Sequence, residues 1–310
     1  MIRSGAAGPR LPDFIVVGPP RTATTWLDKA LRGRVGLPAG VKETHFFARN
    51  HARGLGWYAA HFRDCDPDLP IGEICASYFE NAEAAERLHQ LLPRCRIICT
   101  LRDPVERLHS YYKLMRQGGK TVLGFDEAVR THGAMLRFSR YATQLQAWRQ
   151  WFGAENVLVA LNEDLVADPQ AYIDRIAAFI GAAPIRLNDE VIARNRVNTV
   201  ERAPRYAWLA RSARAARNWL GANRLYRVRK RLGSMGVWRF CSGGGEPFGP
   251  IDPATRSWLI EQLRPDIEQL ETMLSRDLTG WLGDVRQTPV PPVAAEPAPP
   301  CRQPAGATFA

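Results

Sequence analysis

The stretch Phe14-Ile-Val-Val-Gly-Pro-Pro-Arg-Thr-Ala-Thr-Thr-Trp26 decides the fold. It begins with an apolar, β-branched run that is too short for a helix, which predicts a buried strand of a parallel sheet. Gly18 and the two prolines after it end the strand, and an apolar-periodic run from Thr24 begins a helix. The first N–H groups of a helix have no intrahelical partner, and the helix dipole favours negative charge. The turn therefore predicts an anion-binding cradle.

The cradle differs from the nucleotide P-loop, G-x-x-x-x-G-K-[ST], at two positions. Gly18 and Thr25 match it, whereas Ala23 replaces the second glycine and Thr24 replaces the lysine. In kinases and ATPases that lysine reaches the terminal phosphates, so its absence argues against ATP chemistry. The nearby cation in the loop is Arg21. An ordinary strand–turn–helix with a threonine cap stays open as an alternative.

A second candidate anion site follows the apolar run 96–101. Asp103 followed by Pro104 is a typical helix start, with aspartate as the N-cap and proline at the first helical position. Arg102 therefore lies at the carboxyl end of a strand, where open α/β sheets bind ligands. Ser110 follows a little over two turns later, so both side chains can grip one phosphate. An ion pair between Arg102 and a neighbouring carboxylate is an equally open alternative.

A third motif is Gly40-Val-Lys-Glu-Thr-His-Phe-Phe47. In an extended chain, Lys42 and Thr44 would share one face, and Glu43 and His45 the other. A carboxylate beside buried aromatic rings is a candidate general base, because desolvation raises its pKa toward neutral pH. A surface turn with a solvated Lys–Glu pair is the alternative.

Apolar strand-like runs alternate with amphipathic helical patterns through most of the chain. The runs begin at residues 14, 72, 96 and 156, and the longer helical patterns cover 82–92, 104–112, 125–135, 141–152, 169–180 and 253–274. This alternation predicts an α/β fold with a parallel sheet and helices on its faces. We expect a loose arm over residues 1–12, one domain over 13–284, and a disordered Pro/Ala-rich tail over 285–310.

Charge is concentrated in one segment. The chain of 310 residues has a formal net charge of +11, which favours an anionic partner. Residues 201–231 hold ten Lys/Arg and one acidic residue, interleaved with aromatic and apolar side chains. This basic helical segment can contact an anionic membrane or an acidic acceptor, or it is a solvated basic face over a small apolar stripe. We expect no specific nucleic-acid partner.

Cysteine spacing and terminal sequence indicate the compartment. The six cysteines show no C-x-x-C pattern, which predicts buried free thiols rather than a zinc site or a disulfide framework. The N-terminus has no apolar signal region, and no run of 18 apolar residues occurs. The sequence therefore predicts a cytoplasmic protein, with peripheral membrane contact as an option.

Together, Pro-Pro-Arg-Thr-Ala-Thr-Thr-Trp-Leu and Leu-Arg-Asp-Pro-Val-Glu-Arg-Leu-His-Ser-Tyr-Tyr resemble motifs of the sulfotransferases that use 3′-phosphoadenosine 5′-phosphosulfate (PAPS). The likeness covers roughly residues 13–282. The Glu-x-His-Phe-Phe form resembles the Golgi-type, heparan-sulfate-like branch and its bacterial relatives, in which glutamate is the base. The resemblance implies a P-loop NTPase-like, three-layer α/β/α fold with a central parallel sheet of about five strands.

The same resemblance implies in-line transfer of a sulfuryl group from PAPS to a hydroxyl or amine. Glu43 would be the general base, Arg21 a catalytic cation, and Lys42 or His45 would orient acceptor or sulfate, with no metal. The implied PAPS-binding residues are Arg21, Thr22, Ala23, Thr24, Thr25, Trp26, Arg102 and Ser110. The adenine-side loop is predicted at 243–249, and glycan, lipid and small metabolite all stay open as acceptors.

Three positions depart from the family pattern: Arg21 replaces a lysine, Ala23 a glycine, and Ile74 the lysine of heparan-type relatives. Two other function classes therefore stay open beside the sulfotransferase. One is a P-loop-type kinase or nucleotide hydrolase. The other is a non-catalytic protein that binds anions or membranes through residues 201–231.

Overall fold

The computed structural model describes residues 10–188, 191–192, 201–222 and 225–283. Most of the predicted arm and the predicted tail lie outside these ranges. The central sheet has four parallel strands in the order β2-β1-β3-β4. The strands are β1 (Phe14–Val16), β2 (Gly72–Ile74), β3 (Arg96–Leu101) and β4 (Val157–Leu161). The predicted sheet of about five strands therefore has four strands within the described ranges.

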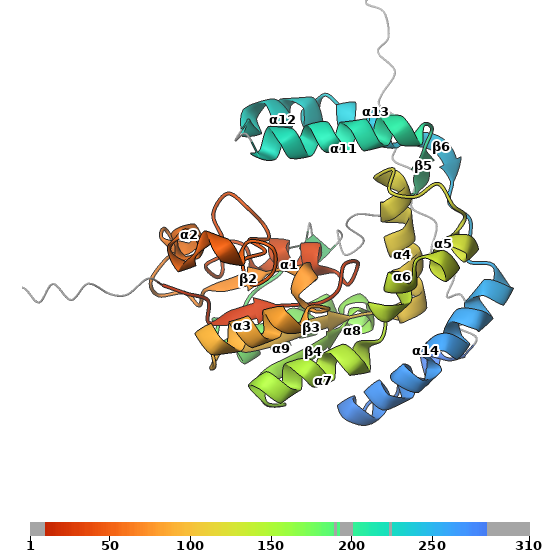
Figure 1. Ribbon diagram of the computed structural model, residues 1–310. Helices are drawn as coiled ribbons and strands as arrows, with labels where there is room; N and C mark the ends of the chain where they lie inside the picture. The colour runs from red at the N-terminus through yellow and green to blue at the C-terminus, as the bar shows by residue number, and fades with distance from the viewer. Residues whose placement is uncertain (1–9, 189–190, 193–200, 223–224, 284–310) are drawn as a thin grey trace, which may run out of the picture.

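Helices cover both faces of this sheet, which confirms the three-layer arrangement (Figure 1). Alternate residues of β1 point to opposite sides: Phe14 and Val16 belong to one core, and Ile15 to the other. On the first side lie α1 (Thr24–Leu31) and α9 (Pro169–Ile180). On the second side lie α3 (Ala82–Leu91), α4 (Pro104–Gln117), α7 (Tyr141–Phe152) and α14 (Pro253–Leu274).

The predicted helix starts are confirmed at three Asp-Pro pairs. The Asp103 carboxylate accepts hydrogen bonds from the N–H groups of Val105 and Glu106 at 2.8 and 3.1 Å. Asp168 and Asp252 cap α9 and α14 in the same way. These caps stabilise the first turns of α4, α9 and α14.

Two predicted elements are shorter than expected. The helix expected over 125–135 divides into α5 (Phe125–Thr131) and α6 (Gly133–Arg137), because His132 leaves helical geometry with φ −96° and ψ 74°. The strand expected from Gly72 ends at Ile74 and gives way to the 3₁₀ turn η3 (Ala76–Tyr78). Between β1 and β2 lie the short helix α2 (Leu55–Ala59) and the 3₁₀ turn η2 (Ala60–Phe62).

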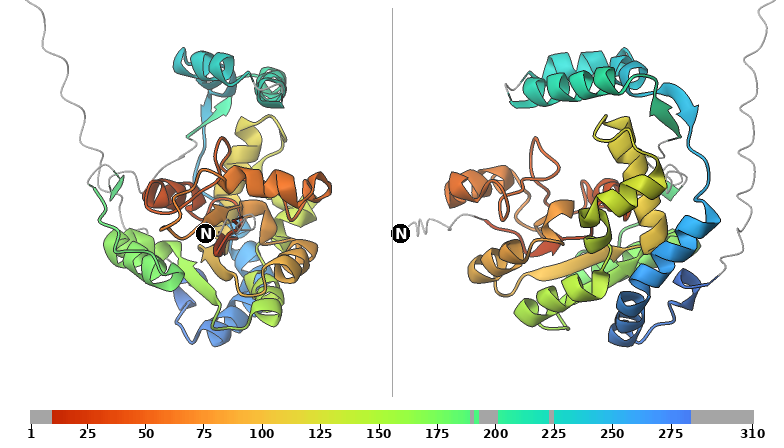
Figure 2. Two further views of the ribbon diagram at one scale, coloured as in Figure 1. Left: turned by 90° about the vertical axis from the view of Figure 1, so that its left-hand side faces the viewer. Right: turned by 45° about the vertical axis from the view of Figure 1, so that its right-hand side comes forward.

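The basic segment forms a separate layer over one end of the molecule, as both views in Figure 2 show. It contains β5 (Arg202–Pro204), α11 (Ala207–Ala222) and most of α12 (Tyr226–Ser234). The short helix α13 (Val237–Ser242) completes the layer, and β6 (Gly244–Pro247) pairs antiparallel with β5. No helix in the described ranges is both long and apolar enough to cross a membrane.

The prediction of buried free thiols holds for Cys75, Cys95 and Cys99. Cys65 and Cys241 are also free thiols, but they are only partly buried. Cys301 lies outside the described ranges.

Candidate active site

The cradle requires a residue without a side chain where β1 ends. A Cβ atom on Gly18 would lie 1.8 Å from the Thr100 Oγ1 atom of β3, so only glycine fits. Further along, Arg21 and Ala23 have φ values of 81° and 65°, in the left-handed region that disfavours non-glycine residues. Ala23 is the N-cap of α1 and has no side-chain cap hydrogen bond. The first N–H groups of α1 therefore have no capping side chain, as an anion cradle requires.

Two of the predicted cradle residues turn their side chains into the protein. Thr22 is 1% exposed, and its hydroxyl donates to the Pro19 carbonyl at 2.7 Å and lies 2.8 Å from Thr100 Oγ1. Trp26 is 2% exposed, and its ring packs edge-to-face against Tyr172. For Thr22 and Trp26, the backbone N–H groups are what can face an anion.

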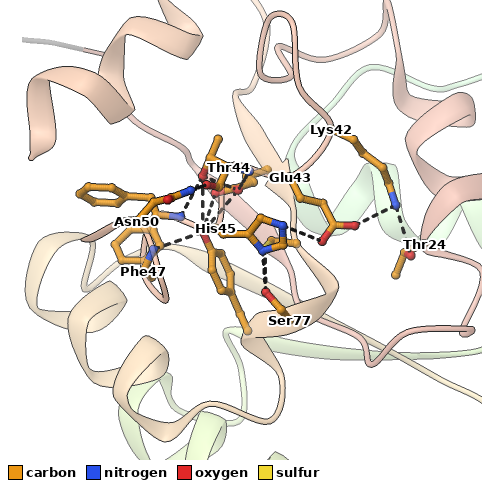
Figure 3. A network of polar contacts seen from close by, with 12 residues as sticks. Thr24, Lys42, Glu43, Thr44, His45, Phe47, Asn50 and Ser77 are labelled. Carbon is orange, nitrogen blue, oxygen red and sulfur yellow. Dashed lines mark hydrogen bonds and ion pairs between the residues drawn. The ribbon is translucent and has the colours of Figure 1, made fainter. Parts of the chain in front are cut away.

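A lysine from outside the loop lies where the P-loop lysine is missing. The Lys42 Nζ atom is 3.5 Å from Thr24 Oγ1 and 3.4 Å from Thr25 Oγ1 (Figure 3). It is also 3.4 Å from Glu43 Oε1. Lys42 thus joins the cradle to the candidate base. Sequence spacing could not reveal this, because 17 residues separate Lys42 from Thr25.

Arg21 turns away from the threonines and toward the second motif. Its Nε atom donates to Ser110 Oγ at 2.8 Å. Burial and the charge of Arg102 lower the Arg21 pKa. Burial also lowers the pKa of Lys113, one turn beyond Ser110, and the charges of Arg102 and Arg21 add to that shift. The sequence analysis missed Lys113, although its spacing of three from Ser110 puts both on one helix face.

We call Arg21, Arg102 and Lys113 the cation cluster. Glu106 partly offsets it, since its carboxylate lies 3.9 Å from Arg102 and also pairs with Arg256. The predicted alternative of an Arg102–Glu106 pair therefore exists, but at the far limit of an ion pair. Three partly desolvated cations that repel one another favour a bound anion.

Glu43 and His45 lie together, as predicted, although the segment is not the extended chain from which that prediction came. The Glu43 Oε2 atom is 3.9 Å from His45 Nε2, and His45 Nδ1 is 2.8 Å from Ser77 Oγ (Figure 3). The prediction that Lys42 shares a face with Thr44 is wrong, because Lys42 pairs with Glu43 while Thr44 is 2% exposed and points into the core. The segment is not a strand, and the φ of 53° at His45 breaks the alternation.

A buried glutamate that the sequence analysis did not assign holds this segment. The Glu73 side chain is fully buried on β2, and its Oε1 accepts from the Thr44 N–H at 2.7 Å and the Thr44 hydroxyl at 2.6 Å. Its Oε2 accepts from the Tyr58 hydroxyl at 2.9 Å, and the Tyr78 hydroxyl lies 3.3 Å from both oxygens. Burial raises the Glu73 pKa, and these hydrogen bonds oppose the shift. The sequence signal that could have revealed Glu73 is a glutamate within an otherwise apolar strand run.

An aromatic pocket adjoins the cation cluster. His109, Tyr112, Phe125 and Phe248 help to line it, together with the chain at 246–250. The Phe248 ring packs edge-to-face on Tyr112, and Lys113 Nζ lies 5.9 Å from its centroid. Burial lowers the His109 pKa to about 4, so its ring is neutral at pH 7. The predicted adenine-side loop thus forms β6 and then enters this pocket.

Fold and site define an α/β protein with a candidate anion-binding edge, where the predicted cradle, the cation cluster and a carboxylate converge. A family model described as "Sulfotransferase domain" matches residues 11–235, and the chain belongs to this family. The resemblance inferred from the sequence is confirmed.

Similar proteins include heparan sulfate enzymes. Human heparan sulfate glucosamine 3-O-sulfotransferase 6 is 30% identical over 189 residues, which cover 58% of this chain and 55% of that protein. Mouse bifunctional heparan sulfate N-deacetylase/N-sulfotransferase 4 is 28% identical over 198 residues, covering 56% and 23%. The chain therefore spans about half or less of the length of these curated relatives. A solved sulfotransferase from Alicyclobacillus acidocaldarius has the same fold, with a TM-score of 0.64 at 21% identity over 88% of this chain and 99% of that one.

Proposed function

We propose that this protein transfers the sulfuryl group of PAPS to a hydroxyl or amine of an acceptor. PAPS supplies a sulfuryl group on a phosphate leaving group, next to a second phosphate on the ribose. The observation that carries the proposal is the pairing of an uncapped helix N-terminus at Ala23 with the cation cluster around Ser110. Two neighbouring anion sites suit a ligand with two anionic groups, and the family membership supports the same ligand.

The residues present fit such a ligand. The N–H groups from Ala23 to Trp26, with the Thr24 and Thr25 hydroxyls, would hold the 5′-phosphosulfate. Lys42 would supply positive charge beside the Thr24 and Thr25 hydroxyls, because Arg21, the cation of the loop, donates to Ser110 instead. Positive charge is worth most where negative charge grows on the departing phosphate. The cation cluster and Ser110 would hold the 3′-phosphate. The pocket around Phe248 would take the adenine, since aromatic rings and a neutral His109 suit a flat base.

Glu43 would act as general base on the acceptor. Its carboxylate is about three-quarters buried and is held between Lys42 and His45. A positioned base lowers the barrier by removing the acceptor proton as the new bond forms. Burial and Arg49 lower the His45 pKa, so its ring is neutral at pH 7 and can orient Glu43 or the acceptor.

The first test is a comparison of two nucleotides. Adenosine 3′,5′-bisphosphate should bind the full chain far more tightly than 5′-AMP in calorimetry, and Arg102→Ala should remove the difference. Arg96→Ala is the matched control, because Arg96 lies exposed at the opposite end of the same strand. Equal binding of both nucleotides by the unmodified protein would overturn the assignment. Transfer of labelled sulfate from PAPS to an acceptor panel, followed by mass spectrometry, then tests the reaction.

A kinase or nucleotide hydrolase is the alternative that the cradle leaves open. Its catalysis would need a metal-holding carboxylate beside the phosphates. Asp103 stands near that place, but its carboxylate caps α4. Turnover of Mg-ATP without PAPS turnover would favour this alternative.

The layer α11–α13 would contact an anionic surface, either a membrane or an acidic acceptor. In addition to its charge, it exposes Trp208, Trp219, Met235 and Phe240 by 61% or more. Exposed tryptophans among arginines suit an interfacial surface. Vesicles with anionic lipid should bind the protein in a salt-dependent way, and Trp208→Ser should weaken that binding while Trp151→Ser, on α7, should not. Heparin that competes equally with vesicles would point to an acidic acceptor instead.

A further inference from the structure

Three potential metal ligands converge in the candidate active site, and one of them is the candidate base itself. Glu43, His45 and Cys75 each offer one donor atom, and these atoms all lie within 4.8 Å of one another. Glu43 and His45 come from the segment after α1, while Cys75 directly follows β2. No role in sulfuryl transfer falls to Cys75, so the presence of a thiol here has no explanation in the proposed function.

The best-defined spacing among these atoms suits a tetrahedral metal. His45 Nδ1 and Cys75 Sγ are 3.5 Å apart. Bond lengths of about 2.0–2.1 Å to nitrogen and about 2.3 Å to sulfur, at the tetrahedral angle, put these two ligand atoms about 3.6 Å apart. The Glu43 carboxylate, about a quarter exposed, offers the third ligand atom within 4.8 Å of the other two. The fourth corner is left for water, and Ser77 Oγ lies 2.8 Å from His45 Nδ1 and 3.4 Å from Cys75 Sγ.

The forms of these side chains that bind a metal are the thiolate and the neutral imidazole. Metal binding therefore releases the thiol proton of Cys75 to solvent. Lys42, 3.4 Å from Glu43, and Arg49 oppose a cation here. Mg²⁺ and Ca²⁺ prefer oxygen ligands, so the thiolate–imidazole pair selects a softer ion.

We propose that Glu43, His45 and Cys75 form an inhibitory site for a borderline-soft divalent metal ion such as Zn²⁺. Bound metal occupies the Glu43 carboxylate and so withdraws it from the acceptor proton. The inhibition rests on the proposed role of Glu43, whereas the binding does not. The metal is therefore a regulator, and the reaction itself still proceeds without it.

Cobalt spectroscopy tests the binding on the full chain after chelation of bound metals. Co²⁺ should give a thiolate-to-cobalt absorption band, Zn²⁺ should remove it, and Cys75→Ser should abolish it. Cys65→Ser is the matched control, because Cys65 is a partly buried free thiol outside the cluster. Binding of adenosine 3′,5′-bisphosphate reports whether each variant is folded, and Cys75→Ala serves as the second substitution. No band in the unmodified protein, or an equal band in Cys75→Ser, would overturn the site.

Zinc titration of sulfuryl transfer tests the inhibition. Zn²⁺ should inhibit the unmodified protein, and Cys75→Ser should need at least 10- to 100-fold more zinc, in line with the cost of disturbing a metal site. Without zinc, Cys75→Ser should turn over as fast as the unmodified protein. A cysteine-dependent cobalt band without zinc inhibition would support the site and overturn the role of Glu43. A protein that binds the metal but never transfers sulfate would overturn the proposed function alone.

Discussion

The cation cluster and the segment 42–45 face the same edge of the sheet, but their side chains are held in different ways. Burial lowers the pKa values of Arg21 and Lys113, and repulsion among Arg21, Arg102 and Lys113 adds to both shifts. The segment 42–45 is instead held by Glu73 of β2, which accepts hydrogen bonds from both the backbone N–H and the hydroxyl of Thr44. The arrangement of the cation cluster therefore becomes favourable only when an anion is bound. Segment 42–45 is organised without a ligand.

The largest effect should come from Glu43, the proposed general base. Glu43→Gln keeps the shape but cannot take a proton, so turnover should fall by about 10²- to 10⁴-fold. Binding of adenosine 3′,5′-bisphosphate should stay nearly unchanged, because the cation cluster lies on the other side of the site. Single-turnover rates and calorimetry on the same samples measure both. A variant that turns over normally would remove Glu43 as the base.

The next largest effect should come from Glu73, and it should appear first in stability. Glu73→Ala leaves the Thr44 N–H and the hydroxyls around it without their acceptor in the core, which should lower the free energy of unfolding by about 3 kcal/mol. Glu73→Gln keeps part of the hydrogen bonding and should cost less. Urea unfolding measures the difference. If the two variants were equally stable, the hydrogen bonds would not be what holds segment 42–45.

The site also shows which contacts a sequence can predict and which it cannot. The predicted anion-binding motifs are local: the run from Gly18 to Thr25 and the Asp103-Pro104 helix start each contain their own signal, and the family resemblance connects them. Glu73 acts on Thr44 across 29 residues, and Lys42 reaches Thr25 across 17. Those contacts depend on how β2 and the segment after α1 pack. Periodicity misplaced Lys42 for the same reason, since it assumed a strand where His45 has a positive φ.

A pH series sharpens the account of Glu73. Burial raises its pKa in the folded protein above the usual 4.5, so the folded state holds this proton more firmly than the unfolded state. The contribution of Glu73 to stability is therefore greatest below pH 4.5 and declines as pH rises through the folded-state pKa. Glu73→Gln does not titrate, so its stability relative to the unmodified protein should improve over that rise. A constant difference between pH 4 and 8 would contradict the raised pKa.

A smaller effect should come from Lys113, a member of the cation cluster. Lys113→Ala should weaken binding of adenosine 3′,5′-bisphosphate roughly fivefold, about 1 kcal/mol, and make it less sensitive to salt. Lys120→Ala is the control, since Lys120 is exposed in the turn after α4. Calorimetry at two salt concentrations measures both changes. Equal losses in the two variants would mean that general charge, rather than the cluster, attracts the nucleotide.

The smallest effect should come from Ala23, where the cradle uses a strained backbone. A left-handed conformation costs a non-glycine residue about 1–2 kcal/mol, and glycine in turn loses about 0.5–1 kcal/mol more entropy on folding. Ala23→Gly should therefore stabilise the ligand-free protein by about 0.5 kcal/mol. Ala30→Gly, inside α1, should destabilise it, so the two substitutions differ in sign. Thermal unfolding with and without adenosine 3′,5′-bisphosphate measures the change in stability of each variant.

Because the backbone strain at Ala23 lies in the cradle, Ala23→Gly should leave the hydrogen bonds of Glu73 to Thr44 unaffected. A loss of stability in Ala23→Gly would mean that the Ala23 methyl group contributes more through packing than its conformation costs.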